Sequence, residues 1–144
     1  MTNEYHYEHE IMVTVGGSEA IDLAIRAMVN PGEEVLIPMP SYVSYLPCVQ
    51  LAYGVPVVIN LKEENEFRLT KEELLEHITD KTKILILPFP NNPTGAIMPR
   101  EQLEEIAKVC IEKDIFVISD EIYAELSYYG ERHVSIAEMP GMKE

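Results

Sequence analysis

The stretch KILILPFPNNPTG, residues 83–95, joins a short apolar run to a turn that contains three prolines, two asparagines and a glycine. An uninterrupted Ile and Leu run is typical of a strand buried on both faces of a parallel sheet. Proline fixes φ and has no N–H to donate, so the prolines end this strand and stiffen the chain after it. The sequence therefore predicts a buried strand that leads into a rigid turn, in which the Asn92–Pro93 bond can be cis.

Four more runs rich in Val and Ile share this pattern, and segments with helical spacing separate them. The expected strands cover residues 10–15, 33–39, 55–61, 83–89 and 114–120. The expected helices cover residues 18–29, 41–52, 70–79 and 100–113. Strands that alternate with helices favour right-handed crossovers and parallel pairing. The predicted fold class is α/β, a mainly parallel sheet with helices on both faces in three layers (α/β/α).

Composition narrows the class of protein before any motif is considered. A chain of 144 residues with 47% apolar residues is long enough for about one globular domain. Eleven Lys and Arg against 25 Asp and Glu give a net charge of −14, which disfavours nucleic acid and anionic membranes as partners. The two cysteines form no disulfide pattern, and the sequence has neither a signal peptide nor an apolar run of membrane-spanning length. We therefore expect a cytoplasmic protein without membrane contact.

A glycine pair and a serine follow the first expected strand and open a helix, as Gly16, Gly17 and Ser18. Unpaired N–H groups and the positive end of the helix dipole favour an anion there, and the glycines allow it to come close. A glycine turn with a serine cap has the same pattern without any ligand. The sequence contains neither GxGxxG nor a P-loop at this place. The anion site is therefore a hypothesis that depends on the other strand ends.

Polar and aromatic side chains stand at three other strand ends, where ligands bind in parallel α/β sheets. Tyr42 follows the second strand and can stack on a flat ring, and Asn92 lies in the turn after the fourth. Asp120 ends the fifth strand, where a carboxylate needs a cation or a set of donors, and Tyr123 falls on the same side if the chain turns helical. Taken singly, each residue also has an explanation without a ligand. Tyr42 fits core packing, Asn92 fits a rigid turn, and Asp120 fits a helix cap.

The four motifs together resemble the fold-type I pyridoxal-phosphate aminotransferases of class I/II, the group that includes aspartate aminotransferase. They occur in the family's order and span nearly the whole chain, as VTVGGSEAI (13–21), PMPSYVSY (38–45), PNNPTG (90–95) and SDEIYAEL (119–126). The resemblance implies pyridoxal 5′-phosphate as cofactor, with an amino acid and a 2-oxo acid as substrates of the parent protein. It implies no metal ligand.

The resemblance assigns two residues to the cofactor phosphate, one to the face of its ring and three to the ring's polar groups. These are, in that order, Gly17 and Ser18, Tyr42, and Asn92, Asp120 and Tyr123. Asn92 and Tyr123 would hydrogen-bond to the phenolic oxygen. Asp120 would pair with the protonated pyridine nitrogen, which lets the ring act as an electron sink.

The family's Schiff-base lysine lies beyond the aspartate and tyrosine motif, and the small domain lies beyond that lysine, whereas this chain ends at Glu144. The seven lysines stand on helical or charged segments or before strands, where solvated surface groups are expected. We therefore expect residues 1–144 to be a partial cofactor-binding (large) domain without a catalytic lysine and without transaminase activity of its own. The resemblance also implies unpaired sheet edges, which a rearranged strand order, chain exchange or a homo-oligomer would cover.

Two alternatives share these motifs. A pyridoxal-phosphate-dependent lyase or synthase of the same fold would use the same cofactor contacts, because groups outside them select the reaction. An aminotransferase-like sensor domain of a transcription regulator would need a DNA-binding module, and no basic helix-turn-helix pattern occurs in these acidic residues.

Overall fold

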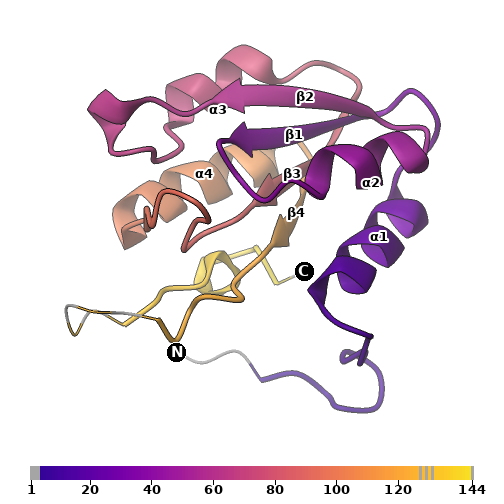
Figure 1. The fold of residues 1–144 in the computed structure, drawn as a ribbon, viewed down its shortest axis with the longest axis horizontal. Coiled ribbons are helices and arrows are strands. Elements are labelled where there is room, and N and C mark those ends of the chain that lie inside the picture. The colour runs from indigo at the N-terminus through magenta and orange to yellow at the C-terminus, as the bar shows by residue number, and fades with distance from the viewer. Residues whose placement is uncertain (1–3, 127, 129, 131, 144) are drawn as a thin grey trace.

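A computed structural model describes residues 4–126, 128, 130 and 132–143, and it contains a parallel sheet between two layers of helices (Figure 1). The strands are β1 (Glu34–Met39), β2 (Val55–Asn60), β3 (Thr82–Leu87) and β4 (Phe116–Ser119). They are hydrogen-bonded in the order β2-β1-β3-β4, and every pair is parallel. The predicted α/β class, with a parallel sheet covered on both faces, is confirmed.

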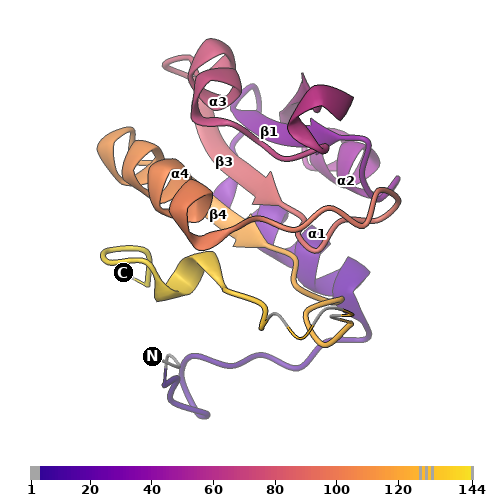
Figure 2. The ribbon, with the colours of Figure 1, turned by 90° about the vertical axis from the view of Figure 1, so that its left-hand side faces the viewer.

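Two helices cover each face of the sheet (Figure 2). Helices α1 (Gly17–Met28) and α2 (Tyr45–Leu51) lie on one face, and α3 (Lys71–His77) and α4 (Arg100–Glu112) lie on the other. Two short 3₁₀ helices, η1 (Glu63–Asn65) and η2 (Ile136–Glu138), lie in the connecting segments. The helices therefore form the outer layers that the alternating sequence pattern predicts.

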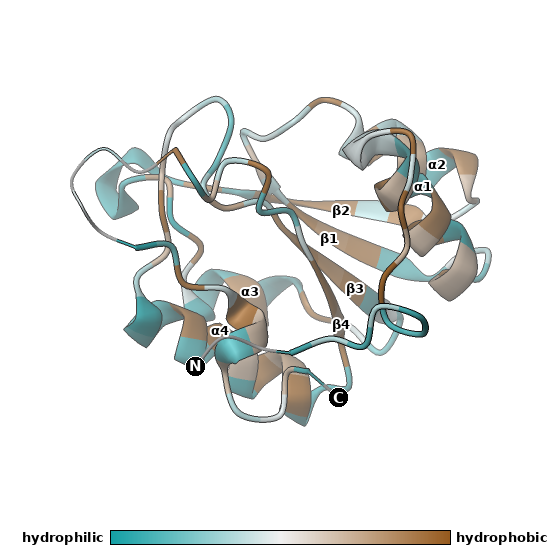
Figure 3. Cartoon of the chain, turned by 90° about the horizontal axis from the view of Figure 1, so that it is seen from below, coloured by the Kyte–Doolittle hydropathy of each residue, from teal (hydrophilic) through white to brown (hydrophobic). Residues whose placement is uncertain are grey.

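The strands are buried on both faces because successive side chains point to opposite sides. Along β3, Ile84 and Ile86 belong to the core beneath α1 and α2, whereas Leu85 and Leu87 belong to the core beneath α3 and α4. All four side chains are at most 1% exposed. Figure 3 shows the resulting apolar strands between the two helical layers. The apolar run that precedes the proline-rich turn is thus the central strand of the domain.

The prediction of a strand at residues 10–15 is wrong. The segment has no sheet partner among the described residues, and Val13 and Val15 are 93% and 91% exposed. A strand needs a neighbouring strand to pair its backbone N–H and C=O groups. The Val and Ile content of the segment satisfies the sequence pattern, but no described strand lies beside it, so it remains irregular.

Helix α1 keeps its place without that strand because its own apolar face is buried. Ile21, Ile25 and Val29 are 6%, 0% and 8% exposed and share a core cluster with Val35 and Ile37 of β1. Burying aliphatic side chains of this size contributes about 1.5–3 kcal/mol each. The packing of α1 on the sheet therefore determines where its N-terminus lies.

The helices and the two cysteines bear on the expected absence of membrane spans and disulfides. No helix among the described residues has the length and apolarity needed to cross a membrane. Cys48 and Cys110 are both free thiols, the first half-buried and the second buried. Burial raises the pKa of Cys110 to about 12, so this thiol stays protonated and unreactive at neutral pH.

The contrast between β3 and the irregular segment gives a matched pair of substitutions. We expect Ile86→Ala to lower the free energy of unfolding by about 2–5 kcal/mol, because it leaves a cavity beneath α1 and α2. Val13→Ala should change the free energy of unfolding by less than about 0.5 kcal/mol, because Val13 is exposed. Urea unfolding followed by circular dichroism measures both values. A Val13→Ala cost equal to that of Ile86→Ala would mean that residues 10–15 are a buried strand after all.

Candidate functional site

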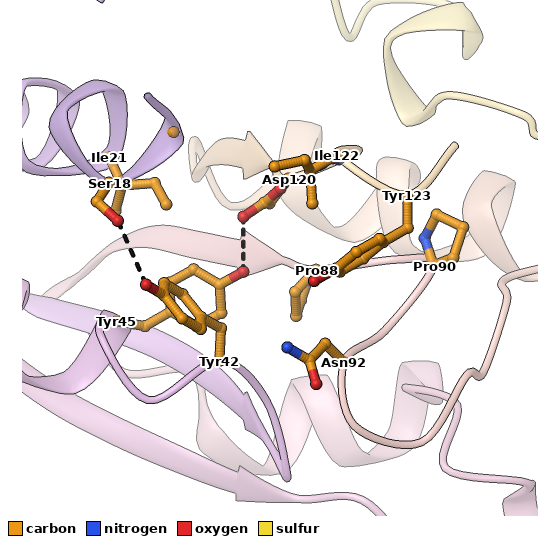
Figure 4. A pocket seen from close by; sticks show the side chains of 11 residues that line it. Ser18, Ile21, Tyr42, Tyr45, Pro88, Pro90, Asn92, Asp120, Ile122 and Tyr123 are labelled. Atoms are coloured by element: carbon orange, nitrogen blue, oxygen red, sulfur yellow. Dashed lines mark hydrogen bonds between the residues drawn. The ribbon is translucent and has the colours of Figure 1, made fainter. Parts of the chain in front are cut away.

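A pocket of about 220 Å³ lies where β1, β3 and β4 end and α1 begins (Figure 4). The six residues that the sequence analysis selected all line this pocket: Gly17, Ser18, Tyr42, Asn92, Asp120 and Tyr123. They come from the start of α1, the loop after β1, the turn after β3 and the turn after β4. Residues separated by up to about a hundred positions in the sequence are thus brought together at one edge of the sheet.

The start of α1 forms one end of the pocket. Gly16, the N-cap, has a φ of 83°, a conformation that glycine adopts without the strain other residues incur. Apart from its chain neighbours and the backbone of its own helix, no atom lies within 4 Å of the point where a Cβ on Gly17 would be, so the space beside this residue is open. The first N–H groups of a helix have no partner within it, and the helix dipole favours negative charge there. This end of the pocket therefore suits an anion.

Tyr42 supplies the aromatic surface of the pocket. Its side chain is 38% exposed, and its hydroxyl oxygen lies 3.4 Å from Oγ of Ser18 at the anion end. The hydrogen bond with Ser18 lowers the pKa of the Tyr42 hydroxyl from its ordinary value. The ring meets the ring of Tyr45 edge to face, with centroids 5.7 Å apart and an interplanar angle of 83°. Tyr42 is thus held at its edge while part of its surface remains open to a ligand.

Tyr45 is the site residue that the sequence analysis missed. Its side chain is 2% exposed, and its hydroxyl donates a hydrogen bond of 2.8 Å to Oδ2 of Asp120. Burial, followed by the hydrogen bond to Asp120, raises the pKa of the Tyr45 hydroxyl well above its ordinary value. A sequence signal existed, because Tyr45 follows Tyr42 by three residues, the spacing that places two side chains on one side of a helical turn.

Asp120 is anchored at both carboxylate oxygens. Besides the bond to Tyr45, its Oδ1 accepts a hydrogen bond of 3.2 Å from the backbone N–H of Ile122. Its own N–H donates to the carbonyl of Leu87 at 3.0 Å, which continues the pairing of β4 with β3. The carboxylate is therefore fixed at the edge of the pocket, where it can pair with a cationic group of a ligand.

Tyr123 and Asn92 form the side of the pocket opposite α1. The chain turns after Asp120, with a hydrogen bond of 2.9 Å from the N–H of Ala124 to the carbonyl of Glu121, and this turn carries Tyr123. Figure 4 shows the hydroxyl of Tyr123 and the side chain of Asn92 directed into the same space. Two hydrogen-bonding side chains thus face a ligand from neighbouring strand ends.

The two adjacent asparagines of the proline-rich turn have different roles. Asn91 is 4% exposed, and its Oδ1 accepts hydrogen bonds from the backbone N–H (3.3 Å) and the hydroxyl (3.0 Å) of Thr94. The Asn91 N–H donates to Ala96 at 2.9 Å, which closes the turn. The Asn92–Pro93 bond is cis, as the turn allowed. Asn91 therefore holds the turn, and Asn92 is left to line the pocket.

No lysine lines this pocket, and a described cluster of possible metal ligands lies outside it. All seven lysines lie in the described part of the chain, and none is among the lining residues. His6, Glu8 and His9 have ligand atoms within 4.8 Å of one another, but these side chains are exposed and lie outside the lining. The described pocket therefore combines an anion site, an aromatic surface and a carboxylate without a lysine.

Comparison with known proteins explains this combination. The family model described as aminotransferase class I and II matches residues 2–144. The chain belongs to this aminotransferase family. The resemblance to the fold-type I aminotransferases is thereby confirmed, and pyridoxal 5′-phosphate is the cofactor that these enzymes generally use.

Similar aminotransferases are known from bacteria and archaea. An aspartate aminotransferase of Pyrococcus abyssi is 50% identical over 135 residues, which are 94% of this chain and 35% of the relative. The structure of N-succinyldiaminopimelate aminotransferase from Mycobacterium tuberculosis has a TM-score of 0.94 at 38% identity, over 99% of this chain and 37% of the other. An aromatic aminotransferase from Pyrococcus horikoshii has a TM-score of 0.86 at 48% identity, over 89% of this chain and 34% of the other. The chain spans about a third of the length of these relatives.

The hydrogen bond between Tyr45 and Asp120 can be tested by its effect on stability. We expect Tyr45→Phe to lower the free energy of unfolding at pH 7 by about 1–3 kcal/mol, because the carboxylate loses a donor. The wild-type chain should also lose stability as the pH rises above about 10, because tyrosine then ionises in the unfolded chain while Tyr45 stays protonated in the folded one. Tyr45→Phe should lack this part of the alkaline loss.

Urea unfolding between pH 7 and 11 measures both effects. Tyr53→Phe is the matched control, because the Tyr53 side chain is 78% exposed and its hydroxyl has no such partner to lose. Equal stability of Tyr45→Phe and Tyr53→Phe at every pH would contradict the role of the buried hydroxyl.

Proposed function

We propose that residues 1–144 are part of the cofactor-binding (large) domain of an aminotransferase, and that the pocket binds pyridoxal 5′-phosphate. One observation carries this proposal: a helix N-terminus, an aromatic surface and an anchored carboxylate line a single pocket at the carboxyl ends of parallel strands. Ligands of parallel α/β folds bind at this edge. Aminotransferases that are similar to this chain in sequence and in structure support the same proposal.

The residues present fit the phosphate of this cofactor. The N–H groups of Gly17 and Ser18 and the hydroxyl of Ser18 are donors at the positive end of a helix, which is a common phosphate site. The open space beside Gly17 leaves room for the phosphate oxygens. The negative net charge of the chain makes such a local site necessary, because the protein as a whole repels anions.

The residues present also fit the ring. Tyr42 would stack on the ring face, and Asn92 and Tyr123 would donate hydrogen bonds to the phenolic oxygen. Asp120, held by Tyr45 and Ile122, would keep the ring nitrogen protonated. When bound, pyridoxal 5′-phosphate supplies the electron sink that amino transfer from an amino acid to a 2-oxo acid requires.

Three further features of the protein belong to this proposal. We infer that this chain binds the cofactor noncovalently and is inactive by itself, because no lysine lines the described pocket. We infer a homo-oligomer, which the exposed apolar side chains of Met12, Val13 and Val15 support. The two free cysteines support a reducing compartment such as the cytoplasm.

Calorimetric titration with pyridoxal 5′-phosphate tests the cofactor proposal. We expect one molecule to bind per chain and to be released on dialysis, because no lysine lines the described pocket to form a covalent bond with it. Asp120→Asn should weaken binding by about tenfold or more, because the ring nitrogen loses a charged partner. Pyridoxal without phosphate should bind more weakly than pyridoxal 5′-phosphate, because the anion site is then unused.

Asp114→Asn is the matched control for this titration. It makes the same substitution two residues before β4, at the end remote from the pocket, where the φ of 54° suits asparagine as well as aspartate. It should bind pyridoxal 5′-phosphate as the wild-type chain does. The proposal fails if the wild-type chain shows no saturable binding, or if Asp120→Asn and Asp114→Asn bind equally well.

A further inference from the structure

Glu121, the residue after Asp120, lies outside the pocket lining and has its own set of contacts. Its Oε1 accepts hydrogen bonds of 2.7 Å from the hydroxyl of Ser119 and of 2.7 Å from the hydroxyl of Ser135. Its Oε2 lies 2.9 Å from Nε2 of His133. Three side chains thus converge on a carboxylate that does not itself face the ligand.

We propose that Glu121 is a positioning residue, which fixes the turn carrying Asp120 and Tyr123 by tying it to the segment 133–135. The geometry of this connection stands by itself, whereas its consequence for cofactor binding rests on the proposed function. Glu121 acts through its neighbours in the chain and touches no ligand. The role is distinct from that of Tyr45, which holds the carboxylate of Asp120 from the side of α2.

The contacts of Glu121 are strong ones. Hydrogen bonds to an ionised carboxylate are roughly twice as strong as those between neutral groups. The side chains of Glu121 and His133 are only 26% and 19% exposed, which limits screening by water. Nε2 of His133 is buried and lies 2.9 Å from Oε2 of Glu121 without a well-aligned hydrogen bond. Removing the carboxylate would leave the hydroxyls of Ser119 and Ser135 without their common acceptor.

The segment to which Glu121 is tied is itself fixed in the core. The hydroxyl oxygen of Ser135 accepts a hydrogen bond of 3.2 Å from the N–H of Ala137 and so caps η2. Ile136 and Met139 are 3% and 2% exposed and belong to the core cluster beneath α3 and α4. Glu138 forms an ion pair of 3.3 Å with Arg100 at the start of α4. The segment therefore provides a rigid anchor for the turn.

Within the described part of the chain, few contacts besides those of Asp120 and Glu121 hold the turn. Ile122 and Leu126 are 70% and 57% exposed, so these two side chains bury little apolar surface. Its backbone hydrogen bonds, from Ala124 to Glu121 and from Leu126 to Tyr123, are local. Such segments open at low free-energy cost unless side chains tie them to the core. Glu121 provides this connection directly beside the residue that would face the ring nitrogen.

Amide hydrogen exchange followed by NMR, without any ligand, tests the positioning role. The N–H of Ile122, which donates to Asp120, and the N–H of Ala124 report on the turn. We expect Glu121→Gln to accelerate their exchange by about tenfold or more, because the uncharged carboxamide accepts weaker hydrogen bonds from Ser119 and Ser135 and places an NH₂ group where Oε2 faces His133. Exchange at Leu85 in β3 should stay unchanged. Glu125→Gln is the matched control, since it removes the same charge from an exposed position in the same turn.

A second variant and a second measurement keep the test decisive. Ser135→Ala removes one donor, leaves the charge in place and should accelerate exchange at Ile122 by a smaller factor. Under the proposed function, Glu121→Gln should also raise the dissociation constant of pyridoxal 5′-phosphate several-fold, while Glu125→Gln leaves it unchanged. If the wild-type chain binds no pyridoxal 5′-phosphate, the cofactor proposal fails, but the exchange result still decides the role of Glu121.

Two results would overturn the inference. Unchanged exchange at Ile122 in both Glu121→Gln and Ser135→Ala would show that the contacts with residues 133–135 do not hold the turn. An equal acceleration at Leu85 in both variants would show that these contacts stabilise the whole domain and do not position the turn.

Discussion

The parallel pairing of β3 with β1 and β4 is the constraint on which the rest of the structure depends. Because all three strands run in the same direction, the segments that leave their carboxyl ends meet at one edge of the sheet. The loop with Tyr42, the turn with Asn92 and the turn with Asp120 therefore face the same space. The helix α1 adds its N-terminus there because its apolar face packs on the same strands. The pocket is thus a consequence of sheet topology, and its chemistry follows from the residues placed at the strand ends.

The fold and the site differ in how far local sequence signals determine them. Four of the five expected strands and all four expected helices occur, because apolar runs and helical spacing describe burial within each segment. Residues 10–15 have the composition of a strand, but a strand also requires a partner, and no short-range pattern reports whether one lies beside it. Tyr45 was missed for a similar reason. Its partner Asp120 is 75 positions away, and only the assembled sheet brings the two together.

The neighbours of the six selected residues matter as much as the residues themselves. Asn91 closes the turn that presents Asn92, Tyr45 fixes the carboxylate of Asp120, and Glu121 connects the next turn to the core. Each supporting residue is buried or half-buried and has its polar side-chain atoms bonded to the protein. A motif such as PNNPTG or SDEIY therefore contains two kinds of residue, one that lines the pocket and one that holds the first in place. The structure distinguishes the two, whereas the sequence presents them side by side.

A crystal structure of the chain soaked with pyridoxal 5′-phosphate tests the central claim most directly. The account predicts phosphate density against the first N–H groups of α1, the ring against Tyr42, and the pyridine nitrogen within hydrogen-bonding distance of Asp120. Phosphate bound away from the start of α1, or a pyridine nitrogen directed away from Asp120, would contradict the account.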